Sequence, residues 1–183
     1  MKITRIAIAL SAGLLGLYLL ANPTLPQSGN VPPLLNLDSY IRITEEPFEM
    51  QESTTALCLV RAESAMSPHE PENPATAFCD VYVNPIAKET MISGEGVYPV
   101  GSLVIKSKLA TPESKRAELF TVMQKMPAGY DADHGDWKYS VIDGKSYRQL
   151  AVGRIDSCID CHAAYQETDY ITRTYLAKLD ESK

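Results

Sequence analysis

The residues best suited to chemistry lie together in the run Cys158-Ile159-Asp160-Cys161-His162. Two thiols three positions apart can each add to a vinyl group of a haem, and the next histidine can reach the iron from the same side. Positions three and four apart share a helix face, so one helical turn would present all three side chains together. The spacing predicts one covalently attached haem c, held by Cys158 and Cys161, with His162 as an axial ligand.

Two other uses of a Cys-x-x-Cys pair fit less well. A structural zinc site needs four ligands, and no further cysteines or histidines at suitable spacing lie near this pair. A thioredoxin-like redox pair opens a helix in a βαβ unit, whereas this pair begins at residue 158 of 183. We therefore carry the haem interpretation forward.

The first 21 residues have the layout of an export signal. Lys2 and Arg5 precede an apolar run over residues 6–21, which Asn22-Pro23 ends. A bulky residue, Leu19, stands where a signal peptidase requires a small one. We expect an uncleaved anchor that tethers the chain to the periplasmic side of the inner membrane. The alternative is a cleaved signal and release into the periplasm.

Residues 22–36 contain four prolines and are expected to form an extended linker to one domain over residues 37–183. Hydrophobic residues make up 45% and charged residues 22%, which is typical of a globular chain. The net charge is −6, and it becomes −8 without the two cations of residues 1–21. Nucleic-acid binding needs a basic face, so this class of partner is excluded.

Two cysteines remain outside the haem motif, Cys58 and Cys79. In an oxidising compartment such a pair is more often a disulfide than two thiols, so we predict that they are bonded. The alternative is that both are buried thiols, packed as small apolar groups.

The hydrophobic period changes along the domain. Residues 37–66 read as helical, with Asp38 or Ser39 capping one helix and Pro47 opening another. Alternation then predicts strands over residues 78–84, 101–109, 120–123 and 137–142. Residues 163–179 read as a closing helix. The fold class is therefore α+β, with a haem-binding helical segment in the C-terminal part of the chain.

A late haem motif that follows β-strands excludes two familiar haem proteins. Small electron-transfer cytochromes c carry the motif near the N-terminus, with a methionine ligand well downstream. Cytochrome c′ has a late motif, but its body is helical throughout.

Four runs of this chain together resemble the cytochrome P-460 and cytochrome c′-beta family. They are residues 80–85 (DVYVNP), 98–106 (YPVGSLVIK), 135–139 (GDWKY) and 158–162 (CIDCH), the last followed by Thr168-Asp169-Tyr170. The similarity covers about residues 50–176. It implies a mainly antiparallel β-sheet domain with a few helices, often homodimeric, in which the proximal histidine, here His162, is the only protein ligand of the haem iron.

In P-460 members a lysine at the end of a G-x-x-x-x-K strand is bonded to the porphyrin edge, and Lys106 matches that position. The resemblance thus places Lys106 in the haem pocket, as a neighbour or a cross-link. The alternative is a solvated strand lysine like Lys108, two residues along on the same face.

Hydroxylamine-oxidising members carry a distal carboxylate between the lysine strand and the tryptophan strand, which suits a base that takes protons from the bound amine. Thr121 stands near that position here, and Glu118, Asp131 and Asp133 match it only with shifts. The catalytic residues stay unassigned.

Other side chains complete the candidate pocket. Phe120, Trp137 and Tyr139 are expected to pack on the haem or the core, with Phe120 on the distal side. Met123 and Met126 are soft sixth-ligand candidates, although methionine more often fills cores. His69 and His134 lie in polar loops, where histidine is usually solvated.

Two functions are consistent with these residues. The first is a periplasmic monohaem cytochrome whose open distal site binds or oxidises hydroxylamine or nitric oxide and exchanges electrons with a small cytochrome. The second is an electron-transfer or accessory haem subunit of a membrane complex. A sixth ligand from Met123, Met126 or His134 would favour the second.

Overall fold

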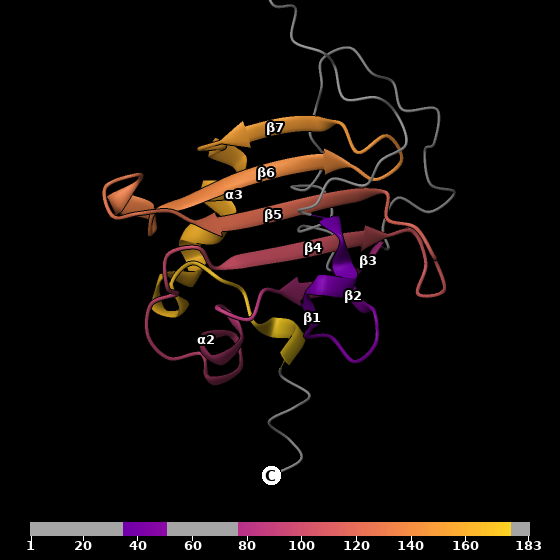
Figure 1. Cartoon of the computed structure of the whole chain (residues 1–183), viewed down its shortest axis with the longest axis horizontal. Helices are drawn as coiled ribbons and strands as arrows, with labels where there is room; N and C mark the ends of the chain where they lie inside the picture. The colour runs from indigo at the N-terminus through magenta and orange to yellow at the C-terminus, as the bar shows by residue number, and fades with distance from the viewer. Residues whose placement is uncertain (1–34, 51–76, 177–183) are drawn as a thin grey trace, which may run out of the picture.

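The computed structural model describes residues 35–50 and 77–176, which are built on one antiparallel sheet of seven strands (Figure 1). The strands are β1 (Ile41–Arg42), β2 (Phe48–Met50), β3 (Ala77–Val83), β4 (Leu103–Leu109), β5 (Leu119–Lys125), β6 (Trp137–Asp143) and β7 (Gln149–Gly153). Strands β3 to β7 pair with their sequence neighbours, while β1 and β2 both pair with β3. Most of the sheet is therefore a meander.

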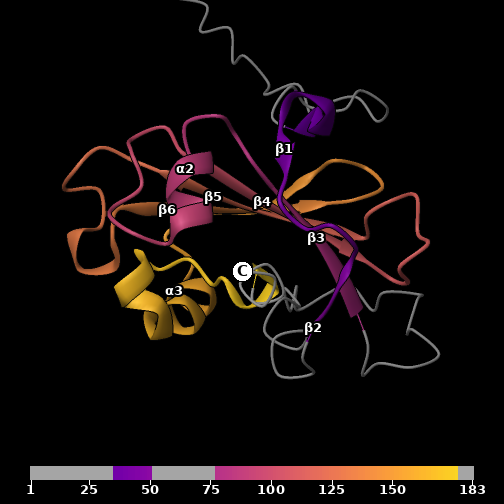
Figure 2. The same cartoon turned by 90° about the horizontal axis from the view of Figure 1, so that it is seen from below.

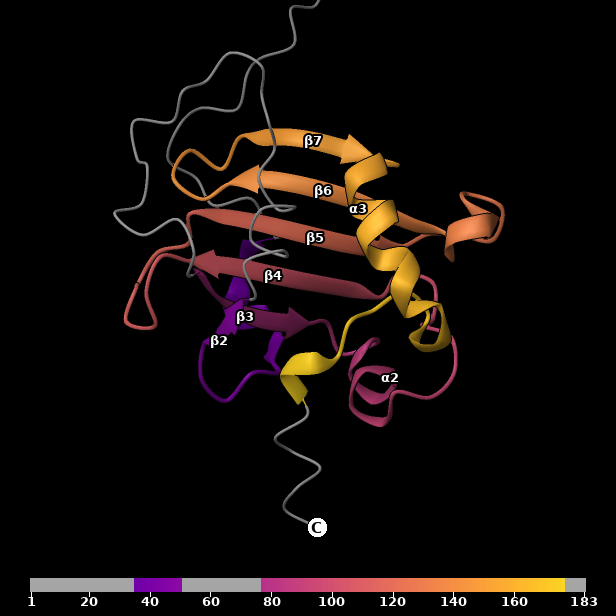
Figure 3. The ribbon, with the colours of Figure 1, turned by 180° about the vertical axis from the view of Figure 1, so that it is seen from behind.

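In the part of the chain that the structure describes, two α-helices accompany the sheet. Helix α2 (Lys88–Ser93) lies between β3 and β4, and helix α3 (Asp156–His162) follows β7. Short 3-10 helices span Leu37–Ser39, Ala132–His134, Ala163–Thr168 and Thr174–Leu176. Helix α3 and the segment after it cover one face of the sheet (Figures 2 and 3). In the described ranges no helix is long and apolar enough to cross a membrane.

The alternation of strand residues sorts buried side chains into two clusters, because successive residues point to opposite faces of a sheet. The face beneath α3 carries the larger cluster, which includes Val81, Val104 and Tyr139. The opposite face carries a smaller cluster with Ile105 and Val122 at its centre. Leu35, near the end of the predicted linker, is buried in this second cluster.

The expectation of a mainly antiparallel sheet is confirmed, and the four predicted strands correspond to β3, β4, β5 and β6. The third is longer than predicted and runs over Leu119–Lys125. Strands β1, β2 and β7 were not predicted.

The helices predicted within residues 37–66 are wrong where the structure describes them. A single 3-10 turn, Leu37–Ser39, leads directly into β1 and β2. Ile41 pairs with Val83, and Phe48 pairs with Cys79, so the edge of β3 holds both short segments extended. Residues 51–66 lie outside the described ranges, as do the predicted anchor and most of the linker.

The closing helix predicted over residues 163–179 is confirmed only as far as Thr168, and residues 177–179 lie outside the described ranges. The 3-10 helix ends at Thr168, where Asp169 and Tyr170 adopt left-handed φ angles of 50° and 65°. Such angles end a right-handed helix. The chain then forms only one further 3-10 turn, Thr174–Leu176, before the described part stops. The α-helix of this described region is α3, which precedes these 3-10 helices and contains the haem motif.

Candidate functional site

The haem motif lies on helix α3, and one pocket brings its three side chains together. Cys158, Cys161 and His162 all line this pocket, as their spacing predicts. The helix starts after Ile155, whose backbone is extended, and Asp156 places a negative charge in its first turn. A carboxylate there is stabilised by the unpaired N–H groups of the helix start.

The opposite wall of the pocket is the sheet face beneath α3. Most of its side chains are apolar, and they come from β2 to β6. Polar side chains are few among the described residues of this wall, and Lys106 and Thr121 are two of them. An apolar cavity with a few placed polar groups is the usual form of a cofactor site.

The His162 ring is held by a hydrogen bond of 2.6 Å between its Nδ1 and the carbonyl oxygen of Tyr170. A carbonyl only accepts, so Nδ1 carries the proton and Nε2 keeps its lone pair. Burial is the main cause that lowers the pKa of His162 to about 4; the Tyr170 hydrogen bond acts in the opposite direction, and the charge of Lys106 adds to the lowering. The imidazole is thus neutral near pH 7, which is the form that binds iron.

Two tyrosines flank His162. The ring centroid of Tyr139 lies 5.7 Å from that of His162, and the centroid of Tyr165 lies 6.4 Å away. The Tyr139 hydroxyl is buried, and within the described residues it has no hydrogen-bond partner. Burial is the main reason that the pKa of Tyr139 is raised. A buried hydroxyl without a partner beside a pocket indicates that a bound group or water completes the site.

Lys106 and Thr121 occupy one row of the sheet. Lys106 on β4 pairs with Thr121 on β5, which pairs with Val141 on β6, and all three line the pocket. Lys108 lies beyond the pocket lining, with its Nζ 3.9 Å from a carboxylate oxygen of Glu118. The two lysines therefore have different surroundings, although they share a strand face.

These residues fit a covalently held haem. Two thiols and a neutral imidazole face an apolar wall, and a buried hydroxyl there lacks a partner among the residues that the structure describes. Residues 60–173, more than half of the chain, match the protein family described as Cytochrome P460. The chain belongs to the cytochrome P-460 family. Membership in this family implies a haem c protein. A comparison with curated proteins gave no match.

The position of Phe120 differs from the one predicted for the haem pocket. Its neighbour Thr121 faces the pocket, so Phe120 faces the other side of the sheet, because consecutive strand residues alternate. There it stacks on Tyr147, with ring centroids 6.3 Å apart. The expectation that Phe120 lies on the distal side of the haem is therefore wrong.

Trp137 and Tyr139, the two pocket candidates on β6, have different surroundings. Tyr139 lines the pocket, whereas Trp137 is fully buried in the core beside it. The Trp137 indole Nε1 donates to the carbonyl oxygen of Asp169 at 2.8 Å, and its ring meets Tyr98 edge-on.

Of the described residues predicted as candidates for a sixth iron ligand, only Met123 lines the pocket. Met126 lies outside its lining. His134 ends the 3-10 helix Ala132–His134 and is held there by Asp131, with 3.0 Å between Nδ1 and the carboxylate oxygen. His69 lies outside the described residues, as does Cys58 of the predicted disulfide.

The candidate carboxylates Glu118, Asp131 and Asp133 lie elsewhere, and no acidic side chain lines the described part of the pocket. Sequence reasoning missed Phe48, Met50 and Tyr175, which do line it. The alternation of Phe48 and Met50 around Glu49 was the available signal for the two strand residues.

Proposed function

We propose that this chain is a monohaem c-type cytochrome with an open iron site that binds a small nitrogen species, hydroxylamine or nitric oxide. The observation that supports it most is the shared pocket of His162, on α3, and Lys106 and Thr121, on the sheet. The bound haem supplies an iron that can coordinate such a ligand and exchange electrons.

The chain's own residues have separate tasks in this proposal. Cys158 and Cys161 would anchor the macrocycle, and His162 would offer Nε2 to the iron. The ammonium of Lys106 and the hydroxyl of Thr121 can donate hydrogen bonds to a bound N–O group, and a charged donor makes the stronger bond. Hydroxylamine oxidation also requires a proton acceptor, and the described lining contains no carboxylate. The residues therefore favour binding over turnover.

The absorption spectrum of the ferrous protein, before and after addition of nitric oxide, tests this proposal. We expect a high-spin spectrum that changes with nitric oxide. A red-shifted ferrous band of the P-460 type would add a Lys106 bond and favour hydroxylamine oxidation. A low-spin spectrum that ignores nitric oxide would overturn the open site.

Haem attachment has its own test. After denaturing electrophoresis, haem should stay with the wild-type chain and leave a chain that carries Cys158→Ala and Cys161→Ala. Haem that remained bound to the double variant would contradict thioether attachment at these positions.

A second function has a specific observation in its favour. Two thioethers, those of Met50 and Met123, line the pocket and are potential axial ligands. A six-coordinate haem would suit an electron-transfer or accessory subunit of a membrane complex. Met50→Leu or Met123→Leu would then convert a low-spin spectrum to a high-spin one.

We also propose that residues 1–21 tether the domain to the periplasmic side of the inner membrane. There it would exchange electrons with a small cytochrome.

A further inference from the structure

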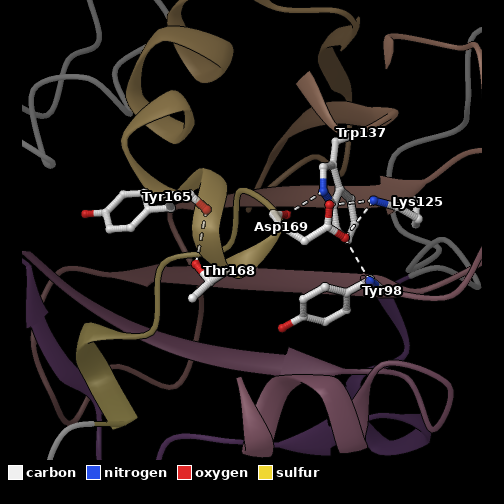
Figure 4. Close-up of polar contacts among 6 residues, drawn as sticks. All are labelled: Tyr98, Lys125, Trp137, Tyr165, Thr168 and Asp169. Carbon is white, nitrogen blue, oxygen red and sulfur yellow. Dashed lines mark hydrogen bonds and ion pairs between the residues drawn. The ribbon is translucent and has the colours of Figure 1, made fainter. Parts of the chain in front are cut away.

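A buried ion pair lies beside the haem helix, between the end of β5 and the turn that follows the 3-10 helix Ala163–Thr168 (Figure 4). The Lys125 ammonium lies 2.7 Å and 2.6 Å from the two carboxylate oxygens of Asp169. Lys125 is 6% exposed and Asp169 is 8% exposed. Both charges are therefore largely removed from water.

Asp169 is also held from two other directions. The backbone N–H of Tyr98 donates to its Oδ2 at 2.8 Å, and the indole Nε1 of Trp137 donates to its carbonyl oxygen at 2.8 Å. The Lys125 ammonium lies 5.0 Å from the centroid of the Trp137 ring. One turn is thus fixed to β5, to β6 and to the loop before β4.

The backbone of this turn needs such support. Asp169 and Tyr170 are consecutive left-handed residues, and neither is glycine. Residues in this region persist where their surroundings hold them. The N–H of Tyr170 donates to the carbonyl of Tyr165 at 2.7 Å, which closes the turn back onto the 3-10 helix.

The turn presents the Tyr170 carbonyl to His162. Its oxygen lies 2.6 Å from Nδ1, and it belongs to the residue directly after the one that Lys125 binds. The position of the acceptor is therefore coupled to the ion pair through one residue of backbone.

We propose that Lys125 and Asp169 are positioning residues that control how strongly His162 donates electrons to the haem iron. This inference rests on the proposed role of His162 as the axial ligand. A hydrogen bond from Nδ1 to an acceptor makes the other ring nitrogen a stronger donor, and a stronger donor lowers the reduction potential of the iron. Loss of the ion pair releases the turn and weakens that bond.

A purely structural role is the alternative, so the test must observe the iron–histidine bond. The variant combines Lys125→Met with Asp169→Asn, because removal of one partner alone would leave a buried charge unpaired. Resonance Raman spectroscopy of the ferrous haem protein should show the iron–histidine stretch at a lower frequency. The reduction potential should become more positive.

Two single variants serve as controls. Lys125→Arg keeps the positive charge and should keep both values close to wild type. Lys108→Met makes the same chemical change to a lysine of the neighbouring strand, outside the pocket lining, and should change neither.

A folded double variant with an unchanged stretch and potential would overturn the inference. If the double variant does not fold, Lys125→Gln combined with Asp169→Asn is measured under the same criterion, since this pair is also uncharged and the asparagine oxygen can still accept from Tyr98. If the iron–histidine stretching band is still present in the His162→Gly variant, another group is the axial ligand. That result would refute the proposed site, and with it the basis of this inference.

Discussion

At the scale of single residues, Lys106 and Lys108 show that position along a strand determines which side chain reaches the pocket. Both belong to β4 and point to the same face, yet only Lys106 lines the pocket that holds His162. Sequence spacing treats the two lysines alike. The difference arises from where the pocket lies along β4, and tertiary packing sets that position, which no local pattern encodes.

Lys106→Ala should weaken nitric oxide binding by about tenfold or more, since a charged hydrogen bond contributes about 1.5–3 kcal/mol. Titration of the ferrous protein, monitored by absorption, measures this affinity. Lys108→Ala is the matched control and should leave the affinity unchanged. Equal affinities in all three proteins would show that Lys106 plays no part in ligand binding.

The site residues that sequence could predict are those set by short spacing. Cys158, Cys161 and His162 share a helix turn, so their common pocket follows from local geometry. Phe120 was misplaced by one position, which in a strand reverses the face. The Tyr170 carbonyl could not be foreseen, because it depends on two left-handed residues that are not glycine.

At the scale of elements, the turn after the haem helix packs closely against another loop. A Cβ atom at Gly135 would lie 2.5 Å from the Tyr170 ring and 3.0 Å from an Asp169 carboxylate oxygen. The lack of a side chain at Gly135 therefore lets the loop after β5 support the turn that holds His162.

Gly135→Ala should lower the free energy of unfolding by about 1–3 kcal/mol through overpacking, in addition to the strain of its positive φ. Gly129→Ala is the control, because Gly129 also has a positive φ but its Cβ would meet no atom within 4 Å. Chemical denaturation measures both. Equal losses would mean that backbone strain, and not the contact with Tyr170, limits this position.

The long strands were predictable because each alternates over several residues and is buried on at least one face. Strands β1 and β2 contain two and three residues, too few for a period, and the edge of β3 defines them. The closing helix was overpredicted because helical spacing in residues 163–179 carries no sign of the reversal at Asp169.

At the scale of the whole molecule, the predicted anchor determines in which cell fraction the protein should be found. The full chain should remain in the membrane pellet through a high-salt wash, because an apolar helix is held by the bilayer and not by charge. A chain in which a cleavable signal replaces residues 1–21 should appear in the soluble periplasmic fraction. A wild-type protein found in that fraction and beginning after Ala21 would show that the segment is cleaved.

The predicted disulfide would link the sheet to a segment outside the described residues. Cys79 is buried on β3 and lines the haem pocket. Thiol counting on the denatured, non-reduced haem protein should find neither Cys58 nor Cys79 reactive, while Cys58→Ala should expose one thiol. Two reactive thiols in the wild type would contradict the bond.

The meander described above also has a consequence for biogenesis. Strands β3 to β7 pair with their neighbours in sequence, and α3 follows all of them. Contacts between neighbouring segments form with little loss of loop entropy, so they can form early. A chain that emerges from its N-terminal side delivers the whole sheet before Cys158 and Cys161. The sheet face that forms one wall of the pocket can thus fold before Cys158 and Cys161 are available for haem attachment.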